Sequence, residues 1–142
     1  MEVYDTNKIK EIIPHREPML LVNEIHVMDN KSIEGRYYFH GDEWFFKGHY
    51  PGNPIVPGII LCEIMAQTSC GLLQSGTKGK TPYLVSITNA KFRKVVHPGD
   101  DCKVKAALIN RKGPFLFVSC KMYVNDLLCA ESELSFVLKN TG

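Results

Sequence analysis

Residues 45–73 read FFKGHYPGNPIVPGIILCEIMAQTSCGLL, and the rest of the chain is organised around them. The first half is rich in glycine and proline, which restrict the conformations available to a loop. The second half, from Gly58 onwards, is apolar, lacks proline and predicts a helix. A helix that is apolar on nearly every side must be buried on nearly every side. We therefore expect the remaining elements to enclose this helix.

The segments on either side of this helix have the composition and alternation of β-strands. A short helix over Thr6–Ile13, with Asp5 or Thr6 as its N-cap, precedes them. Asn125 and Asp126 suit the tight turn of a hairpin between the last two strands. The predicted strands are Met19–Met28, Ser32–His40, Tyr83–Phe92, Asp101–Ile109, Phe115–Val124 and Leu127–Leu138.

These elements predict an α+β protein in which a curved antiparallel sheet of about six strands wraps around one long central helix. This is the hot-dog arrangement. The 142 residues contain no internal repeat, low-complexity segment or composition shift that would mark a second domain. We therefore expect residues 1–142 to form a single hot-dog domain.

Charge, hydropathy and cysteine spacing exclude several classes of protein. A formal net charge of +2 indicates no general affinity for nucleic acid. The N-terminal residues lack the apolar region of a signal peptide. The longest apolar run, Ile59–Met65, is interrupted by Glu63 and is much shorter than the roughly 20 residues of a membrane span. Five cysteines without C-x-x-C spacing indicate a reduced, cytoplasmic protein without disulfides or structural zinc.

His49 and Glu63 are the two strong acid–base candidates of the central stretch. A rigid glycine- and proline-rich loop can hold the imidazole of His49 in place as a general base, although it could instead be a turn histidine. Glu63 has apolar neighbours on the helix, so its carboxylate must be protonated, paired or placed at a cleft. Gln67, four residues further on, lies on the same helix face and could orient Glu63. A solvent-facing glutamate or a structural ion pair is the alternative.

Pro57 and Gly58 stand where this helix should begin. Proline is preorganised for a first helical turn, and glycine lets a ligand approach the backbone. The free N–H groups and the positive end of the helix dipole could then polarise a carbonyl oxygen. Together with a base and an acid, such a helix start suits enolate-type chemistry.

Other chemistries have less support in the sequence. A serine-hydrolase elbow of the G-x-S-x-G type is absent, and so is a phosphate-binding glycine loop. Cys62 and Cys70 fall within the apolar helix pattern, which is typical of packing residues. The histidines show no H-x-x-x-H spacing, so no metal site is expected.

The central stretch GHYPGNPIVPGIILCEIMAQ resembles the signature of the FabZ-type (3R)-hydroxyacyl-acyl-carrier-protein dehydratases. Two flanking blocks, IIPHREPMLLVNEI and YLVSITNAKFRKVVHPGD, resemble further blocks of that family. Tyr50, Asn23 and Glu17 depart from the usual residues without touching the acid–base pair. Glutamate rather than aspartate at position 63 favours the dehydratases over the related dehydratase-isomerases.

The resemblance implies a hydro-lyase of fatty acid biosynthesis that converts a (3R)-hydroxyacyl chain on acyl carrier protein into a trans-2-enoyl chain. It implies that His49 removes the α-proton, that Glu63 helps the 3-hydroxyl leave, and that the Gly58 N–H polarises the thioester carbonyl. His49 of one subunit would meet Glu63 of another, so a dimer is the minimal active unit, and a homohexamer is the usual assembly. No cofactor is implied beyond the phosphopantetheine arm of the carrier protein.

The resemblance also implies substrate contacts for Tyr83, as a gate to the acyl tunnel, and on weaker grounds for Phe46, Ile59 and Phe92. The basic cluster Lys91, Arg93 and Lys94 is either a solvated strand edge or a docking patch for the acidic carrier protein. Two other functions stay open at this point. One is a hot-dog acyl thioesterase, and the other is a non-catalytic module that binds acyl ligands.

Overall fold

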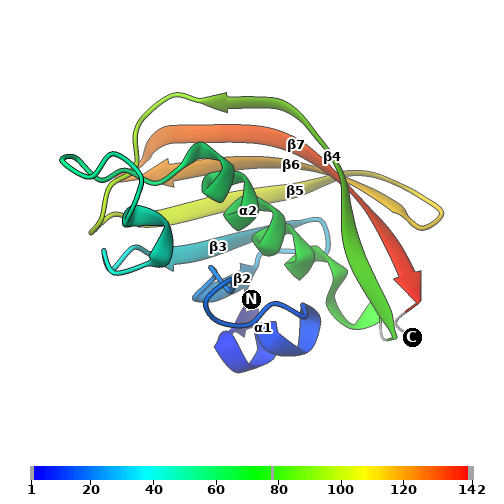
Figure 1. The fold of residues 1–142 in the computed structure, drawn as a ribbon. Coiled ribbons are helices and arrows are strands. Elements are labelled where there is room, and N and C mark those ends of the chain that lie inside the picture. The colour runs from blue at the N-terminus through cyan, green and yellow to red at the C-terminus, as the bar shows by residue number, and fades with distance from the viewer. Residues whose placement is uncertain (1, 78, 141–142) are drawn as a thin grey trace.

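The computed structural model describes residues 2–77 and 79–140, with the backbone alone described over 74–77. One antiparallel sheet curves around the helix α2, Gly58–Ser69 (Figure 1). The sheet order is β1-β2-β3-β5-β6-β7-β4. The strands are β1 (Glu2–Tyr4), β2 (Glu24–Val27), β3 (Ser32–Tyr38), β4 (Lys80–Phe92), β5 (Asp101–Lys112), β6 (Phe115–Val124) and β7 (Leu127–Asn140). The other helices are α1 (Thr6–Ile12) and the 3₁₀ helices η1 (Trp44–Phe46) and η2 (Cys70–Thr77).

Helix α2 is the centre of the hydrophobic core. Nine of its twelve residues are buried, and it contacts β3, β4, β5, β6 and β7. The strand side chains that face it alternate in burial along β3, β5 and β6. This confirms the α+β hot-dog fold and the prediction that an apolar helix would be enclosed by the sheet.

A glycine in the sheet allows this close packing. Gly35 of β3 lies against Thr68 of α2, and a Cβ at position 35 would stand 2.5 Å from the Thr68 Cγ2 atom. Thr68 itself is fully buried. Any larger residue at position 35 would push the helix and the strand apart.

The local signals were correct at the turns and caps. Asp5 is the N-cap of α1 and accepts a hydrogen bond from the Lys8 N–H. Asn125 and Asp126 both have positive φ, 50° and 64°, as a two-residue hairpin turn between β6 and β7 requires.

The sheet has seven strands rather than about six, and several strand ends differ from the predicted ones. The short strand β1 pairs with β2 and was not expected, because three residues are too few to show a strand period. The predicted strand over Met19–Met28 is wrong in its first half, since β2 begins only at Glu24. Leu20, Leu21 and Val22 are buried without strand pairing, which explains why this segment has a strand-like composition.

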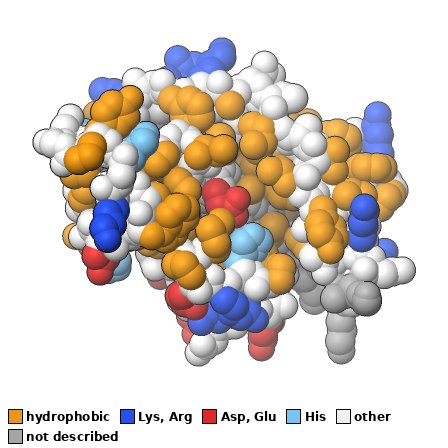
Figure 2. Space-filling view, viewed as in Figure 1, with side chains coloured by type: hydrophobic (Ala, Val, Ile, Leu, Met, Phe, Trp, Pro, Cys, Tyr) orange, Lys and Arg blue, Asp and Glu red, His pale blue; other side chains and the backbone are white. Residues whose placement is uncertain are grey.

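Strand β4 forms one edge of the sheet, and among the described strands it pairs with β7 alone. It carries five exposed hydrophobic side chains, whereas an edge strand of a monomer is usually short or charged. In the view of Figure 2, which has α2 in front of the sheet, hydrophobic side chains gather on the surface of the molecule. The exposed residues of β4 are Tyr83, Leu84, Val85, Ile87 and Phe92. In the described part of the chain, no helix has the length and apolarity needed to cross a membrane.

Candidate active site

His49 lies in the loop between η1 and α2, and one nitrogen of its ring makes a hydrogen bond to the backbone. The ring nitrogen Nδ1 is 3.1 Å from the carbonyl oxygen of Ile55. A carbonyl can only accept, so Nδ1 carries the hydrogen and donates it. In the neutral ring, Nε2 then keeps its lone pair. The loop therefore presents His49 in the tautomer that a general base needs.

The hydrogen bonds and the positive φ of this loop lie away from Gly48 and Gly52. Tyr50, and not a glycine, has positive φ (53°), and its carbonyl accepts the Asn53 N–H in a tight turn. A Cβ added at Gly48 or Gly52 would meet nothing within 4 Å. The turn at Tyr50 and the hydrogen bond from the Val56 N–H to the Val96 carbonyl thus hold the loop.

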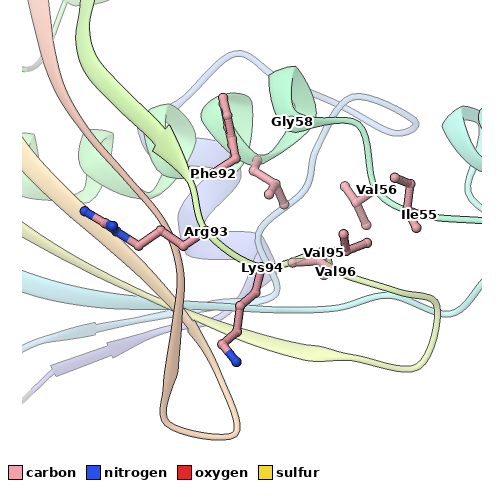
Figure 3. Close-up of a pocket in the computed structure, with 9 residues that line it drawn as sticks. Ile55, Val56, Gly58, Phe92, Arg93, Lys94, Val95 and Val96 are labelled. Carbon is pink, nitrogen blue, oxygen red and sulfur yellow. The ribbon is translucent and has the colours of Figure 1, made fainter.

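Helix α2 begins at Gly58 with Pro57 as its N-cap residue. The ring of Phe92 lies against this turn, 3.2–3.3 Å from where a Cβ of Gly58 would stand. Both residues line a cavity of about 190 Å³ at the start of the helix, and the Arg93 and Lys94 side chains point away from it (Figure 3). In this structure the Phe92 ring makes the close approach to Gly58, and contact of a ligand with the helix start stays a prediction.

Glu63 lies further along α2, and its side chain is 28% exposed. Its Oε2 atom accepts a hydrogen bond from Gln67 Nε2 at 2.8 Å and lies 3.4 Å from His15 Nε2. The His15 contact lowers the pKa of the Glu63 carboxyl, burial raises it, and the Gln67 hydrogen bond lowers it further. The net shift is downward. Glu63 is thus a paired and ionised carboxylate at neutral pH.

Gln67 is held in place by the N-terminal segment. Its Nε2 also donates to the Met19 carbonyl at 2.6 Å, and its Oε1 accepts the Leu21 N–H at 2.8 Å. Its side chain is 1% exposed. This confirms the prediction that Gln67 bonds to Glu63, and it shows why the amide cannot turn away.

Glu63 borders a cavity of about 460 Å³ between α2, the loop before β2 and the sheet edge β4. Tyr83, predicted from the resemblance to be a gate, lines this cavity together with Leu84. The remaining lining residues are Pro14, His15, Ala66, Gln67, Cys70, Thr81, Pro82 and Phe136. The carboxylate therefore faces a partly apolar space with an aromatic residue at its β4 wall.

His49 and Glu63 do not meet within one chain. His49 is absent from the lining of the Glu63 cavity, and no contact joins the two side chains in the part of the chain that the structure describes. One chain thus holds the His49 imidazole and the Glu63 carboxylate in two separate places.

The other predicted residues lie in varied surroundings. Phe46 is buried in an aromatic cluster with Phe39 and Phe45. Ile59 is 76% exposed at the start of α2. Their substrate contacts stay predictions.

The basic cluster is partly neutralised by an acid. Arg93 Nε is 2.7 Å from Glu131 Oε2, and Lys91 lies opposite Glu131 in the β4–β7 register. Lys94 is exposed and makes no ion pair within the described residues. Of the three cations, Lys94 is therefore the one best placed to meet an acidic partner.

The cysteines behave as packing residues. All five are free and buried, and burial raises the pKa of the Cys70 thiol to about 12. Over residues 2–77 and 79–140, no three His, Cys, Asp or Glu side chains form a group that could hold a metal ion. The absence of a metal or cofactor stays a prediction.

Sequence reasoning did not assign a role to His15, which the structure places beside Glu63. A signal was present in the motif PHREP, where a histidine stands between Pro14 and Pro18 in a restricted loop. The same argument that singled out His49 applies to it. The contact itself spans 48 residues of sequence, so only the fold reveals it.

A curved antiparallel sheet around a central helix, with a carboxylate on that helix and a histidine before it, places the chain in the hot-dog fold class. A sequence model described as the FabA-like domain matches residues 13–133. The chain belongs to this FabA-like family.

Three relatives named 3-hydroxyacyl-[acyl-carrier-protein] dehydratase FabZ align over nearly their whole length. The protein from Caldicellulosiruptor saccharolyticus is 39% identical, over 96% of this chain and 100% of its own. That from Clostridium botulinum is 40% identical, over 94% and 95%. That from Lactiplantibacillus plantarum is 35% identical, over 99% and 98%.

Solved structures share the fold at low identity. The dehydratase heterocomplex ApeI:P from Xenorhabdus doucetiae has a TM-score of 0.78 at 14% identity, covering 94% of this chain and 91% of that chain. A thioesterase from Haemophilus influenzae has a TM-score of 0.63 at 17% identity, covering 95% and 85%. The fold alone thus occurs with both activities, and the residues of the site must distinguish them.

Proposed function

We propose that this protein dehydrates (3R)-hydroxyacyl-acyl-carrier-protein to the trans-2-enoyl form in fatty acid biosynthesis. The observation that carries the proposal is the Glu63 carboxylate, held ionised beside a partly apolar cavity by two side chains that reach the same oxygen. The relatives named as dehydratases, similar over nearly the whole chain, support it independently.

The proposed reaction uses His49 as the base. Its unprotonated Nε2 takes the α-proton, which the neighbouring thioester carbonyl makes acidic, and the Gly58 N–H polarises that carbonyl. Glu63 is ionised, so it accepts a hydrogen bond from the 3-hydroxyl and orients it. The C3–O bond then breaks, the proton held by His49 joins the leaving oxygen, and water departs as the C2–C3 double bond forms. The enzyme thus returns to its starting protonation state.

The active unit in this proposal is a dimer, because one chain keeps His49 and Glu63 apart. Strand β4 supplies a candidate interface, since its free edge and its exposed hydrophobic side chains favour pairing with a second copy. The Glu63 cavity is lined by β4 residues, so a second subunit docked there would reach it. A hexamer built from three such dimers is the assembly that the family resemblance implies.

The substrate arrives on acyl carrier protein, and the exposed Lys94 is the proposed contact for that acidic partner. Tyr83, Ile59 and Phe92 are proposed to contact the acyl chain, and Phe46 to support the site from the aromatic cluster. We further propose that the protein works in the cytoplasm, in keeping with its five free cysteines, and needs no metal or cofactor.

The test is hydration and dehydration of a short 3-hydroxyacyl or trans-2-enoyl thioester, followed by absorbance of the conjugated enoyl group. The proposal expects the wild type to turn over this substrate, and the turnover of His49→Ala to be about 10²- to 10⁴-fold lower, because that is the usual contribution of a general base. A matched control is His97→Ala, an exposed loop histidine outside both cavities.

Two other results would overturn the proposal. Release of free thiol without enoyl absorbance would indicate a thioesterase. No turnover of either the short thioester or the carrier-protein substrate by the folded wild type would indicate a module that only binds acyl ligands.

A further inference from the structure

His15 lies in the loop between α1 and β2, and its position is well fixed. The guanidinium of the neighbouring Arg16 donates to three backbone carbonyls, those of Lys10, Ile13 and His15, at 3.1, 3.1 and 2.7 Å. These bonds tie the loop to the end of α1. The imidazole is therefore presented to α2 by a braced segment rather than by a mobile one.

The contacts of Glu63 converge on one of its two oxygens. His15 Nε2 and Gln67 Nε2 both reach Oε2, at 3.4 and 2.8 Å. The Oε1 atom accepts no hydrogen bond from the part of the chain that the structure describes. Two donors on one oxygen fix the rotation of the carboxylate and leave the other oxygen for a ligand.

The surroundings of the second ring nitrogen of His15, Nδ1, indicate which nitrogen of the ring carries the hydrogen. His15 Nδ1 is buried and has no hydrogen-bond partner among the described residues. A buried N–H without a partner is costly, so the favoured neutral tautomer carries its hydrogen on Nε2, toward Glu63. Among the described residues, the polar contact of the ring is then a donation to the carboxylate.

We propose that His15 is a positioning residue that acts through Glu63, holding its carboxylate so that Oε1 is free to receive the 3-hydroxyl of the substrate. The inference rests on the proposed function. It is supported by the electrostatics, because the His15 contact is the largest cause of the lowered Glu63 pKa. The contact at 3.4 Å is long for a hydrogen bond, as such contacts often are before substrate binds.

The test compares two substitutions at position 15. In His15→Gln the side-chain amide can still donate to Oε2, whereas His15→Leu fills the space without a donor. The control is His26→Leu, which removes the other close histidine–glutamate pair, His26 Nε2 to Glu24 Oε1 at 2.7 Å, away from the cavity. Circular dichroism and thermal unfolding establish that each variant is folded.

The first readout needs no substrate. The Glu63 carboxyl is titrated by carbon-13 NMR in protein labelled at glutamate, with Glu63→Gln assigning the signal. We expect the Glu63 pKa to rise in His15→Leu, and to stay near the wild-type value in His15→Gln and His26→Leu. This readout distinguishes failure of the inference from failure of the proposed function, since it stands whether or not the protein turns over a thioester.

The second readout is kinetic. A positioning residue acts on the transition state, so kcat should fall by about 10- to 100-fold in His15→Leu while KM changes little. His15→Gln should recover most of that loss. An unchanged Glu63 pKa in His15→Leu, or a His15→Gln variant as impaired as His15→Leu, would overturn the inference. If His15→Leu does not fold, His15→Asn, whose amide is too short to reach Oε2, takes its place.

Discussion

The side-chain amide of Gln67 donates to Glu63 from one helical turn further along α2, with 2.8 Å between Nε2 and Oε2. The same nitrogen donates to the Met19 carbonyl, and the amide oxygen accepts the Leu21 N–H. Gln67 therefore ties the N-terminal segment to the central helix and at the same time orients the carboxylate that faces the cavity.

Replacing this amide with a carboxylate of the same shape tests its role. In Gln67→Glu, both donations end and a second negative charge lies beside Glu63, which raises the pKa of the carboxyl pair. We expect kcat to fall by about 10- to 100-fold and stability to fall by about 1–3 kcal/mol, since the partly buried hydrogen bond to the Met19 carbonyl is lost. Steady-state kinetics and urea unfolding measure both effects. Asn110→Asp, the same change at an exposed position, should alter neither, and a fully active Gln67→Glu would contradict the prediction.

The two edges of the sheet offer a matched pair of valines for testing the dimer. Val85 on β4 is 55% exposed, and Val3 on β1, at the opposite edge, is 54% exposed. We expect Val85→Lys to give a monomer in analytical ultracentrifugation and to lose at least about tenfold in turnover, because burying a lysine at the interface is costly. Val3→Lys should keep the wild-type assembly and activity. Equal behaviour of the two variants would remove β4 from the interface.

The contact between Gly35 and Thr68 predicts a specific loss of stability and its rescue. Gly35→Ala should destabilise the protein by about 1–3 kcal/mol, the usual range for overpacking, because the new Cβ would stand 2.5 Å from Thr68 Cγ2. Adding Thr68→Ala removes the two closest opposing atoms, Cγ2 and Oγ1, and should restore most of the loss. Urea unfolding of the two single variants and the double variant gives the coupling free energy. Penalties that simply add would show that the two residues do not clash.

The carrier-protein contact is tested at Lys94, because Arg93 is paired with Glu131. Lys94→Glu should raise KM for a carrier-protein substrate by about three- to tenfold while leaving KM for a short thioester unchanged, since charge at an interface rim acts on encounter. The difference should shrink as salt is added. Lys112→Glu makes the same charge change on β5 and serves as the control. An equal effect on both substrates would point to damage within the site instead.

Most of the fold could be predicted from local sequence patterns. The apolar stretch after Gly58, the alternation in β5 and β6, and the turn residues Asn125 and Asp126 each act over a few neighbouring residues, so their consequences can be read from composition and spacing. The missed strand β1 is too short to show a period, and its pairing with β2 depends on residues more than twenty positions away.

The candidate site also has a part that local sequence patterns predict and a part that only the folded structure shows. His49, Glu63 and Gln67 could be chosen from the sequence because rigid loops and i, i+4 helix spacing are local properties. The tautomer of His49 depends on the Ile55 carbonyl, and the ionisation of Glu63 depends on His15, which is 48 residues away. The sequence alone determined which residue types were available for acid–base chemistry and which element would carry each. Only the tertiary structure decided which hydrogen bonds set their protonation, because those bonds depend on how the loop folds around His49 and on the contact of a remote segment with Glu63.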